Sequence, residues 1–309
     1  MEIEAQNPMQ MKVSVVLPVY NVGPYLEAAL DSLCQQTLRE IEIIAVNDGS
    51  TDNSLDIIES YMAKDSRISC YTQKNMGLSG ARNTGMKHCQ GEYVYFMDSD
   101  DILERDALEK CYHTAKELQA DVCIFDADVF YEKNAKPLPW DYDRSDLLEE
   151  GKAYKGSELF DLLLDRKKHK AVVWLQFINW KFLSSLQLNF FQSIIHEDEL
   201  FTPQLFLQSE TIYYINRRFV KHRVRSSSII GKNYSQRNLN CYLTVADELL
   251  KFQRTPIIHK YLRYTLSKVF YTGHLIPLKE KPAVFWRAVK SGYLKYIGLK
   301  SSLVFWFKH

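Results

Sequence analysis

The segment YVYFMDSDDIL, residues 93–103, joins a run of strand-forming, mostly apolar residues to three carboxylates, Asp98, Asp100 and Asp101. Like charges this close repel one another and raise one another's pKa values, unless a cation or a set of hydrogen-bond donors holds them. Asp is also common where strands end and helices are capped, so an ordinary turn is an alternative explanation for this segment alone. The other motifs of the chain are needed to choose between a ligand site and an ordinary turn.

The first 130 residues alternate between strand and helix patterns. Continuous apolar or β-branched runs predict strands at 13–19 (VSVVLPV), 41–47, 68–73, 92–98 and 121–131. Between them, apolar residues at helical spacing predict helices that begin near 23, 54, 77 and 104. Strands separated by helices of this length imply right-handed crossovers and therefore an α/β fold with a mostly parallel central sheet.

In such sheets, ligands bind at the carboxyl ends of the strands, where the strand order switches. The unusual polar residues of this sequence fall in those places, as YN at 20–21, NDGS at 47–50, NMGLSGARN at 75–83 and DSDD at 98–101. Four consecutive strand ends with special residues on one edge favour a ligand site over four ordinary turns.

The DSDD segment has the chemistry of a hard-metal site. Carboxylate oxygens suit Mg²⁺ or Mn²⁺, and a two-residue separation lets Asp98 and Asp100 reach one ion directly or through water. Such ions keep few protein ligands and complete their shell with phosphate oxygens, which predicts a nucleoside diphosphate as co-ligand. Asp48 can accept the N–H of a nucleobase, or it can form an Asx-turn that caps the next helix.

Two further residues suit a nucleotide. Tyr20, after Pro18, offers a face on which a base can stack, or it fills the corner between strand and helix. Arg82 follows a glycine-rich helix start, a combination that binds phosphates or bases. The sequence has no G-x-x-x-x-G-K-[ST], which excludes a P-loop ATPase, and no G-x-G-x-x-G after the first strand, which counts against a dinucleotide enzyme.

These motifs, from SVVLPVYNVGPYL to YFMDSDD, resemble in order and spacing the nucleotide-binding half of glycosyltransferase family 2. The resemblance implies a GT-A fold, which is Rossmann-like, with a helical C-terminal extension. It also implies inversion at the anomeric carbon, a nucleotide-diphosphate sugar, most often a UDP-sugar, and Mn²⁺ or Mg²⁺ as cofactor. The implied divisions are a flexible leader at 1–11, a nucleotide-sugar-binding half at 12–131, an acceptor-binding half at 132–234 and a helical, basic-aromatic region at 235–309.

The resemblance also assigns roles to single residues. It implies a nucleotide-sugar-binding set of Pro18, Tyr20, Asn21, Asp48, Asn75, Gly77, Arg82, Asp98, Arg223 and Arg225, and a metal site at Asp98 and Asp100 with Asp101 in support. HEDELF (196–201) resembles the family's Glu-Asp element, which implies Asp198 as catalytic base and Glu197 as its neighbour. KHRVRSSSI (221–229) resembles a basic loop that closes over the diphosphate and includes His222. The alternative for Asp198 is an acidic start of the helix at 196–208.

The region after residue 131 is less regular. The polar segment 132–156, rich in proline and glycine, is typical of a surface excursion, and SELFDLLL (157–164) predicts a helix with Ser157 as N-cap. Residues 171–183 are dense in large apolar side chains and predict core. TIYYI (211–215) predicts a late strand, and the chain turns helical from about Ser235.

Composition sets the remaining bounds. Hydrophobic residues make up 46% and charged residues 25% of 309, and the net charge of +1 does not suggest a nucleic-acid partner. Six cysteines without a CxxC pair are typical of reduced thiols in a cytoplasmic protein. The N-terminus does not resemble a signal peptide, and no apolar run approaches the length of a membrane span.

The C-terminal segment 279–309 is unusually basic. It holds seven Lys or Arg against Glu280 alone, interleaved with aromatic residues. It is either an amphipathic region on the cytoplasmic face of the inner membrane or a core-packed one with snorkelling lysines. The sequence leaves the oligomeric state open.

These observations predict a metal-dependent, inverting glycosyltransferase that moves a sugar from a UDP-sugar to a saccharide or lipid-linked acceptor, with surface polysaccharide synthesis as the setting that the resemblance implies. Two alternatives remain. A sugar-1-phosphate nucleotidyltransferase should carry a glycine-rich loop after the first strand, which PVYNVGPY (18–25) lacks. A non-catalytic nucleotide-sugar-binding subunit would be expected to lack the carboxylates.

Overall fold

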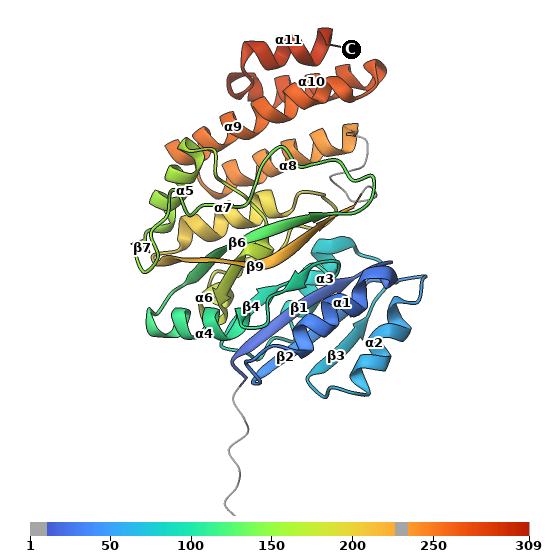
Figure 1. Cartoon of the computed structure of the whole chain (residues 1–309). Coiled ribbons are helices and arrows are strands. Elements are labelled where there is room, and N and C mark those ends of the chain that lie inside the picture. The colour runs from blue at the N-terminus through green and yellow to red at the C-terminus, as the bar shows by residue number, and fades with distance from the viewer. Residues whose placement is uncertain (1–10, 226–233, 309) are drawn as a thin grey trace, which may run out of the picture.

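The computed structural model describes residues 11–225 and 234–308, which Figure 1 shows as a twisted sheet with a stack of C-terminal helices at the end away from β1–β3. The strands are β1 (Val13–Val19), β2 (Ile41–Asn47), β3 (Ile68–Thr72), β4 (Tyr93–Phe96), β5 (Ile102–Leu103), β6 (Val122–Tyr131), β7 (Ala153–Tyr154), β8 (Gln176–Asn179) and β9 (Ile212–Val224).

The α-helices are α1 (Gly23–Cys34), α2 (Ser54–Met62), α3 (Gly77–Met86), α4 (Ala107–Glu117), α5 (Gly156–Asp165), α6 (Trp180–Ser185), α7 (Asp198–Gln208), α8 (Gln236–Phe252), α9 (Pro256–Thr272), α10 (Lys281–Lys290) and α11 (Leu299–Phe307). Short 3₁₀ turns are η1 (Val173–Leu175), η2 (Gly273–Leu275), η3 (Leu278–Glu280) and η4 (Tyr293–Tyr296).

The first half of the sheet is parallel, in the order β3-β2-β1-β4. Every residue of β1 is buried, as its continuous apolar run requires in a strand covered on both faces. Val13 of β1 pairs with Ile41 of β2 on one side and with Tyr93 of β4 on the other. The carboxyl ends of β2 and β4 therefore flank that of β1, and the predicted edge of polar residues is formed.

The second half mixes strand directions. β8 lies antiparallel between β4 and β6, β6 and β9 are parallel, and β5 and β7 pair antiparallel with β9. β8 comes from the apolar 171–183 segment, which is buried core as predicted. The predicted α/β fold with a helical C-terminal extension is confirmed.

Three local predictions need correction. His222 and Arg223 were predicted in a basic loop but lie on β9, the strand that TIYYI begins. The strand continues this far because His222 pairs with Val129 of β6. Residues 226–229 of the predicted loop lie outside the described residues. Helix α5 starts at Gly156, so its N-cap is Lys155 and not Ser157.

The 132–156 excursion is not wholly on the surface. Its Arg144 is buried because its Nε donates to Asp126 Oδ1 on β6 at 2.8 Å, and Tyr142 and Leu148 are buried in the core beside it. This polar segment is therefore anchored to the sheet by an internal ion pair. Of the predicted leader at 1–11, residues 1–10 lie outside the described residues.

The C-terminal region is helical, as predicted. Ser235 caps α8 in a capping box, in which its backbone N–H donates to Asn238 Oδ1 at 3.0 Å. Phe270 of α9 packs at 5.2 Å between ring centroids on Phe305 of α11, and both are buried. Among the helices of the described ranges, none has the length and apolar character needed to cross a bilayer.

Candidate active site

The carboxyl end of β2 carries Asp48, whose buried side chain is fixed by two donors. Its Oδ1 accepts hydrogen bonds from Gln73 Nε2 at 2.7 Å and from the backbone N–H of Met76 at 2.8 Å. Gly49 follows with a φ of 75°, and a Cβ there would lie 3.1 Å from the backbone nitrogen of Asn75. This turn therefore needs glycine. Asp48 is held against the loop before α3 and does not cap α2, which was the alternative.

The end of β1 carries Pro18, Tyr20 and Asn21. Pro18 is buried within the strand, and Tyr20 is exposed over 49% of its surface. Asn21 has a φ of 50°, and its Oδ1 accepts from the backbone N–H of Thr51 at 2.8 Å. Asn21 thus ties the end of β1 to the loop after β2, while the Tyr20 ring stays accessible at the same edge.

The loop into α3 carries Asn75 and Gly77, which are both exposed. The φ of 74° at Gly77 favours glycine, although a Cβ at this position would meet no neighbouring atom within 4 Å. Because Asn75 packs against Gly49, these residues lie at the edge that carries Asp48.

Arg82 of α3 is almost fully buried and joins carboxylates from distant parts of the chain. Its Nη1 donates to Glu197 Oε1 and Asp198 Oδ1, each at 2.8 Å, and its Nη2 donates to Asp98 Oδ1 at 3.0 Å. The Phe190 ring lies 5.1 Å from the guanidinium carbon. A single buried side chain therefore connects the DSDD motif to the predicted catalytic base.

The electrostatics of this cluster differ from those of exposed side chains. Burial raises the pKa of Asp198 to about 7 although the Arg82 charge opposes the rise, and the charges of Glu197 and Asp98 add to it. Burial also raises the pKa of Glu197. Burial alone would lower the pKa of Arg82, but the three carboxylates outweigh it and raise that pKa above its ordinary value. Asp198 is consequently poised near neutral pH, where a general base works best.

Asp198 is the first residue of α7, so a structural role at the helix start was the alternative. The N-cap residue, Glu197, makes no side-chain hydrogen bond to the helix. Asp198 directs Oδ1 to Arg82, and its Oδ2 accepts from the backbone N–H of Val173 at 3.4 Å. Both side chains therefore face the cluster and not the first turn of their own helix.

The DSDD segment gathers its carboxylates as the sequence predicts. Oxygen atoms of Asp98, Asp100 and Asp101 all lie within 4.8 Å of one another. Burial, together with the charges of Asp101 and Asp98, raises the pKa of Asp100 to about 6 although Arg225 and His222 oppose the rise. Crowded carboxylate oxygens of this kind are the donor set that Mg²⁺ or Mn²⁺ prefers.

Strand β9 and Arg225, the residue after it, supply the cations that face these carboxylates. His222 Nδ1 lies 3.0 Å from both oxygens of Asp101, and the backbone N–H of Arg223 donates to Asp101 Oδ1 at 2.8 Å. Arg225 Nη2 lies 2.7 Å from Asp100 Oδ2. Burial lowers the pKa of His222, but its hydrogen bond and charge interaction with Asp101 outweigh this and raise it. Asp101 thus bonds to β9 through both oxygens, while Asp98 and Asp100 each use one oxygen in an ion pair, with Arg82 and Arg225 respectively, and keep the other outside the ion pairs of the described ranges.

Comparisons with known proteins agree with this geometry. The family model for "Glycosyl transferase family 2" matches residues 14–159. Glycosyltransferase GlyA of Streptococcus pneumoniae is 36% identical over 220 residues, which cover 71% of this chain and 31% of GlyA. Cholesterol galactosyltransferase of Borreliella burgdorferi is 32% identical over 294 residues, which cover 90% of this chain and 80% of that protein. The chain belongs to glycosyltransferase family 2.

Solved structures show the fold of this family 2 glycosyltransferase. S. aureus TarS 1-349 in complex with UDP-GlcNAc has a TM-score of 0.71 at 20% identity, over 95% of this chain and 84% of that chain. Mannosyltransferase PcManGT from Pyrobaculum calidifontis, in complex with GDP-Man and Mn²⁺, has a TM-score of 0.58 at 15% identity, over 95% of this chain and 78% of that chain. The predicted GT-A fold is confirmed, and neither the nucleotidyltransferase nor the non-catalytic alternative is favoured.

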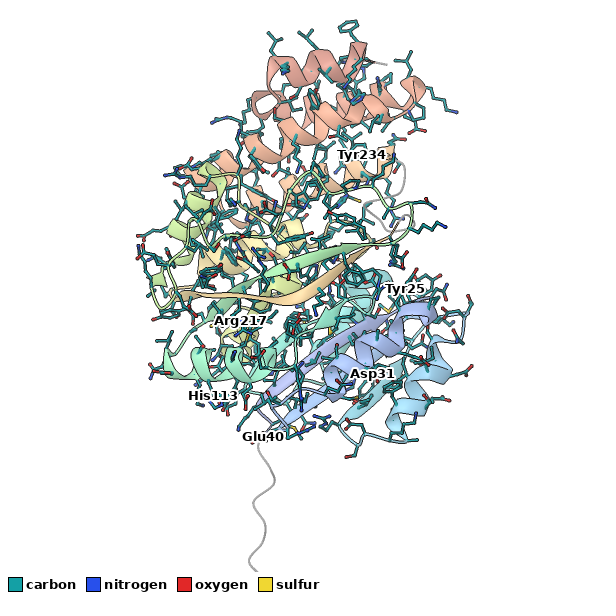
Figure 2. The ribbon with its side chains drawn as sticks, in the orientation of Figure 1. Tyr25, Asp31, Glu40, His113, Arg217 and Tyr234 are labelled. Carbon is teal, nitrogen blue, oxygen red and sulfur yellow. The ribbon has the colours of Figure 1, made fainter. Side chains whose placement is uncertain are left out.

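Three residues at the family 2 site escaped the sequence prediction. Gln73, which fixes Asp48, follows β3 at the ligand edge, so the strand-end argument had the signal to find it. Trp174 stacks on His222 with ring centroids 4.8 Å apart and planes 17° apart, but it lies in a segment predicted only as core. The Tyr25 ring, near the start of α1 in Figure 2, lies 4.8 Å from the guanidinium carbon of Arg225.

Proposed function

We propose that this glycosyltransferase transfers a sugar, with inversion, from a UDP-sugar to a hydroxyl of a saccharide or lipid-linked acceptor in surface polysaccharide synthesis. The observation that carries the proposal is the buried guanidinium of Arg82, which bonds both Asp98 of the donor motif and Asp198. A single displacement needs support for the leaving group on one side of the sugar and a base on the other. One arginine that fixes both sets of carboxylates supports this arrangement.

Asp48 and Tyr20 support a uridine nucleotide. Because Gln73 and Met76 hold Asp48 through Oδ1, its Oδ2, which has no hydrogen-bond partner within 11–225 and 234–308, is available to accept a uracil N–H. The exposed Tyr20 ring offers a stacking face at the same edge. The TarS structure with UDP-GlcNAc has this fold, which supports a UDP-sugar here as well.

Asp98 and Asp100 are the residues that would hold Mg²⁺ or Mn²⁺. Their oxygens are close enough to share an ion, and the PcManGT complex, which has this fold, contains Mn²⁺. A divalent cation there would offset the negative charge that develops on the leaving diphosphate. Arg225, 2.7 Å from Asp100, and its neighbour Arg223 add positive charge at the same place.

Asp198 is the proposed base. As the acceptor oxygen bonds to the anomeric carbon, the bond from that carbon to the diphosphate breaks, and its electron pair leaves with the nucleotide. The hydroxyl proton passes to the Asp198 carboxylate, whose pKa of about 7 leaves much of it ionised at neutral pH. Glu197 shares Nη1 of Arg82 with Asp198 and so keeps the guanidinium, and through it the base, in place.

Asp198→Asn tests the proposal. The amide keeps the size of the side chain but cannot take a proton, so transfer should fall by about 10²–10⁴-fold, the usual contribution of a general base. UDP affinity, measured by calorimetry with Mn²⁺, should stay within about twofold, because Asp198 is placed on the acceptor side.

Asp56→Asn is the matched control. Asp56 also lies in the first turn of a helix, α2, but is exposed. The Asp56→Asn variant also removes a negative charge near a helix start, but it leaves the carboxylates around Arg82 unchanged. Transfer that is unchanged in Asp198→Asn, or equally reduced in both variants, would remove Asp198 from this role.

We also propose that segment 279–309 contacts the anionic surface of the inner membrane. Within 279–308, five large apolar side chains are exposed, with Leu299 at 78% and Phe307 at 75%. Exposed Lys295 and Lys300 accompany them. Exposed apolar and basic groups in one segment favour anionic lipid, and a cholesterol galactosyltransferase among the relatives supports a lipid acceptor.

A further inference from the structure

A second group of cations lies apart from the carboxylates, around the indole of Trp140. Lys170 Nζ lies 5.4 Å and Lys268 Nζ 5.3 Å from the centre of the Trp140 ring, and Lys170 Nζ is 6.0 Å from the ring of Tyr142. Lys170 precedes η1, Lys268 lies on α9, and Trp140 belongs to the 132–156 excursion. Three segments that are far apart in sequence thus build one aromatic and positively charged surface.

The acidic groups nearby are engaged elsewhere. Asp141 lies 3.8 Å from Lys168, and Asp126 pairs with Arg144 at 2.8 Å. Within 11–225 and 234–308, the ammonium groups of Lys170 and Lys268 form no ion pair or hydrogen bond. Burial and, after it, the charge of Lys268 lower the pKa of Lys170 to about 8 although Asp141 opposes this. Asp141 and Glu199 act on these charges without pairing with them in the described ranges, and two ammonium groups beside one aromatic ring favour binding of an anion.

This surface lies on the side of the proposed base. The charges of Lys268 and Lys170 both act on Glu199, the residue after Asp198, and lower its pKa against the rise that burial causes. Lys170 is also three residues from Val173, whose backbone N–H donates to Asp198 Oδ2. The chain connection to Val173 and the charge effect on Glu199 therefore place Lys170 and Lys268 beside the segments that carry and contact Asp198.

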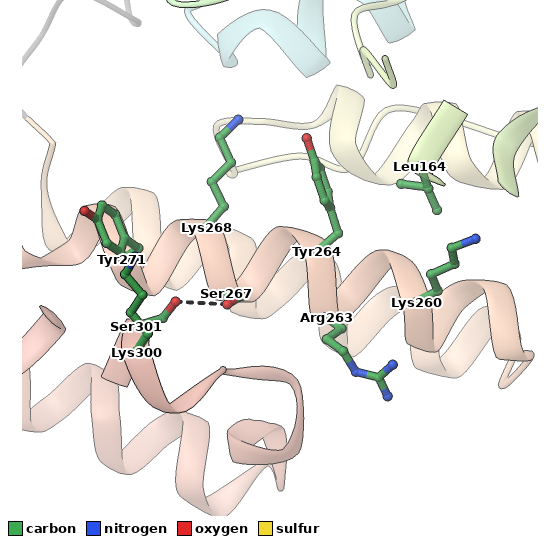
Figure 3. A pocket seen from close by; sticks show the side chains of 9 residues that line it. All are labelled: Leu164, Lys260, Arg263, Tyr264, Ser267, Lys268, Tyr271, Lys300 and Ser301. Carbon is green, nitrogen blue, oxygen red and sulfur yellow. Dashed lines mark hydrogen bonds between the residues drawn. The ribbon is translucent and has the colours of Figure 1, made fainter. Parts of the chain in front are cut away.

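A cavity of about 570 Å³ adjoins Lys268 along α9. Figure 3 shows Lys268 and Tyr264 extending to one side of α9, with Lys260 farther along the same helix. Its lining includes Arg263 and Lys300, so the space is positively charged as well as open to a ligand. Lys260 alone of these cations is paired, to Asp161 and Asp165, among the residues that the structure describes.

We infer that the acceptor carries a phosphate group, and that Lys170 and Lys268 bind this phosphate while Trp140 packs against the atoms beside it. The inference rests on the proposed function, because it assumes that an acceptor approaches Asp198. Phosphate oxygens accept charge-assisted hydrogen bonds from ammonium groups, and the indole face suits the apolar face of a sugar or polyol. The two lysines then select anionic acceptors over neutral ones.

The test uses glycerol 3-phosphate as the probe and glycerol as its neutral counterpart. The full chain is first saturated with UDP and Mn²⁺, so that the donor site is filled and cannot bind the probe. Calorimetry should then detect glycerol 3-phosphate and not glycerol. Lys170→Gln and Lys268→Gln should each weaken binding roughly tenfold, as expected for the loss of one charge-assisted hydrogen bond, and Lys268→Arg should retain most of it.

Lys181→Gln, which removes an exposed lysine of α6, is the control and should bind as the parent does. A second arm replaces the probe with phosphatidylglycerol vesicles: loss of vesicle binding in the two Gln variants, beyond that of Lys181→Gln, would assign the phosphate to a lipid. Equal affinities of parent and Gln variants in both arms, or equal binding of glycerol, would overturn the inference. Failure of UDP to bind in the first step would contradict the proposed function instead.

Discussion

At the residue scale, Arg82 explains why this site is held together. A buried guanidinium is costly unless its charge is met, and here it bonds Asp98, Glu197 and Asp198. The carboxylates outnumber it, so one of them is easily protonated. Burial raises the pKa of Asp198 to about 7, so Asp198 takes up a proton readily near neutral pH. The arrangement sets both the position of the proposed base and the pH range in which it is ionised.

This predicts how transfer depends on pH. A base acts only when it is ionised, so activity from Asp198 should be present above its pKa and lost as pH falls through about 7, approaching tenfold per pH unit below it. Initial rates between about pH 5 and 9 measure the profile. Mn²⁺ must be saturating throughout, because Asp100, with a pKa of about 6, would also bind a metal less well in acid. A flat profile would show that no group with this pKa limits transfer.

At the scale of elements, periodicity and strand-end chemistry predicted much of the site. Asp48, Tyr20 and Asp98 follow apolar strands, so their common edge could be deduced from the parallel sheet. The contact of Arg82 with Glu197 spans 115 positions in the sequence, and no local pattern carries that information. The residues around His222 were predicted as a loop because they are charged and lack the apolar pattern of a strand, although they pair with β6.

The close packing of α3 on β1 gives a test at this scale. A Cβ on Gly85 would lie 2.4 Å from Cγ1 of Val16, so Gly85→Ala should push α3 away from the sheet. Overpacking of this kind costs about 1–3 kcal/mol, which urea unfolding can measure. Transfer should fall too, because Arg82 lies one turn earlier on the same helix. Lys87→Ala, at the exposed C-cap of α3, should change neither, and an unaltered unfolding midpoint in Gly85→Ala would contradict this account.

At the scale of the whole molecule, the sheet edge and α11 lie far apart, as Figure 1 shows. The class of fold was predictable because the first 130 residues follow simple periodicities. The C-terminal segment was not, because aromatic and basic residues at helical spacing fit both packing and lipid contact. In the structure, some apolar side chains of this segment pack inward and others do not: Phe305 is buried in the helical stack, while Leu299 and Phe307 face outward.

The outward side chains should govern membrane binding. A Leu299→Ser, Phe307→Ser double variant should lose most of its sedimentation with phosphatidylglycerol vesicles, because apolar area and anionic charge act together. Phosphatidylcholine vesicles should bind the parent less well. Met62→Ser, which changes an exposed apolar residue of α2, is the control. Undiminished sedimentation of the double variant would exclude this surface as the lipid contact.

The central claim is that donor carboxylates and base form one site around Arg82, and a crystal structure with UDP and Mn²⁺ tests it most directly. Anomalous scattering should place Mn²⁺ on Asp98 and Asp100, with the diphosphate beside it, uracil on Asp48, and the Arg82–Asp198 contact intact. Manganese and UDP bound at any surface remote from these residues would contradict the account.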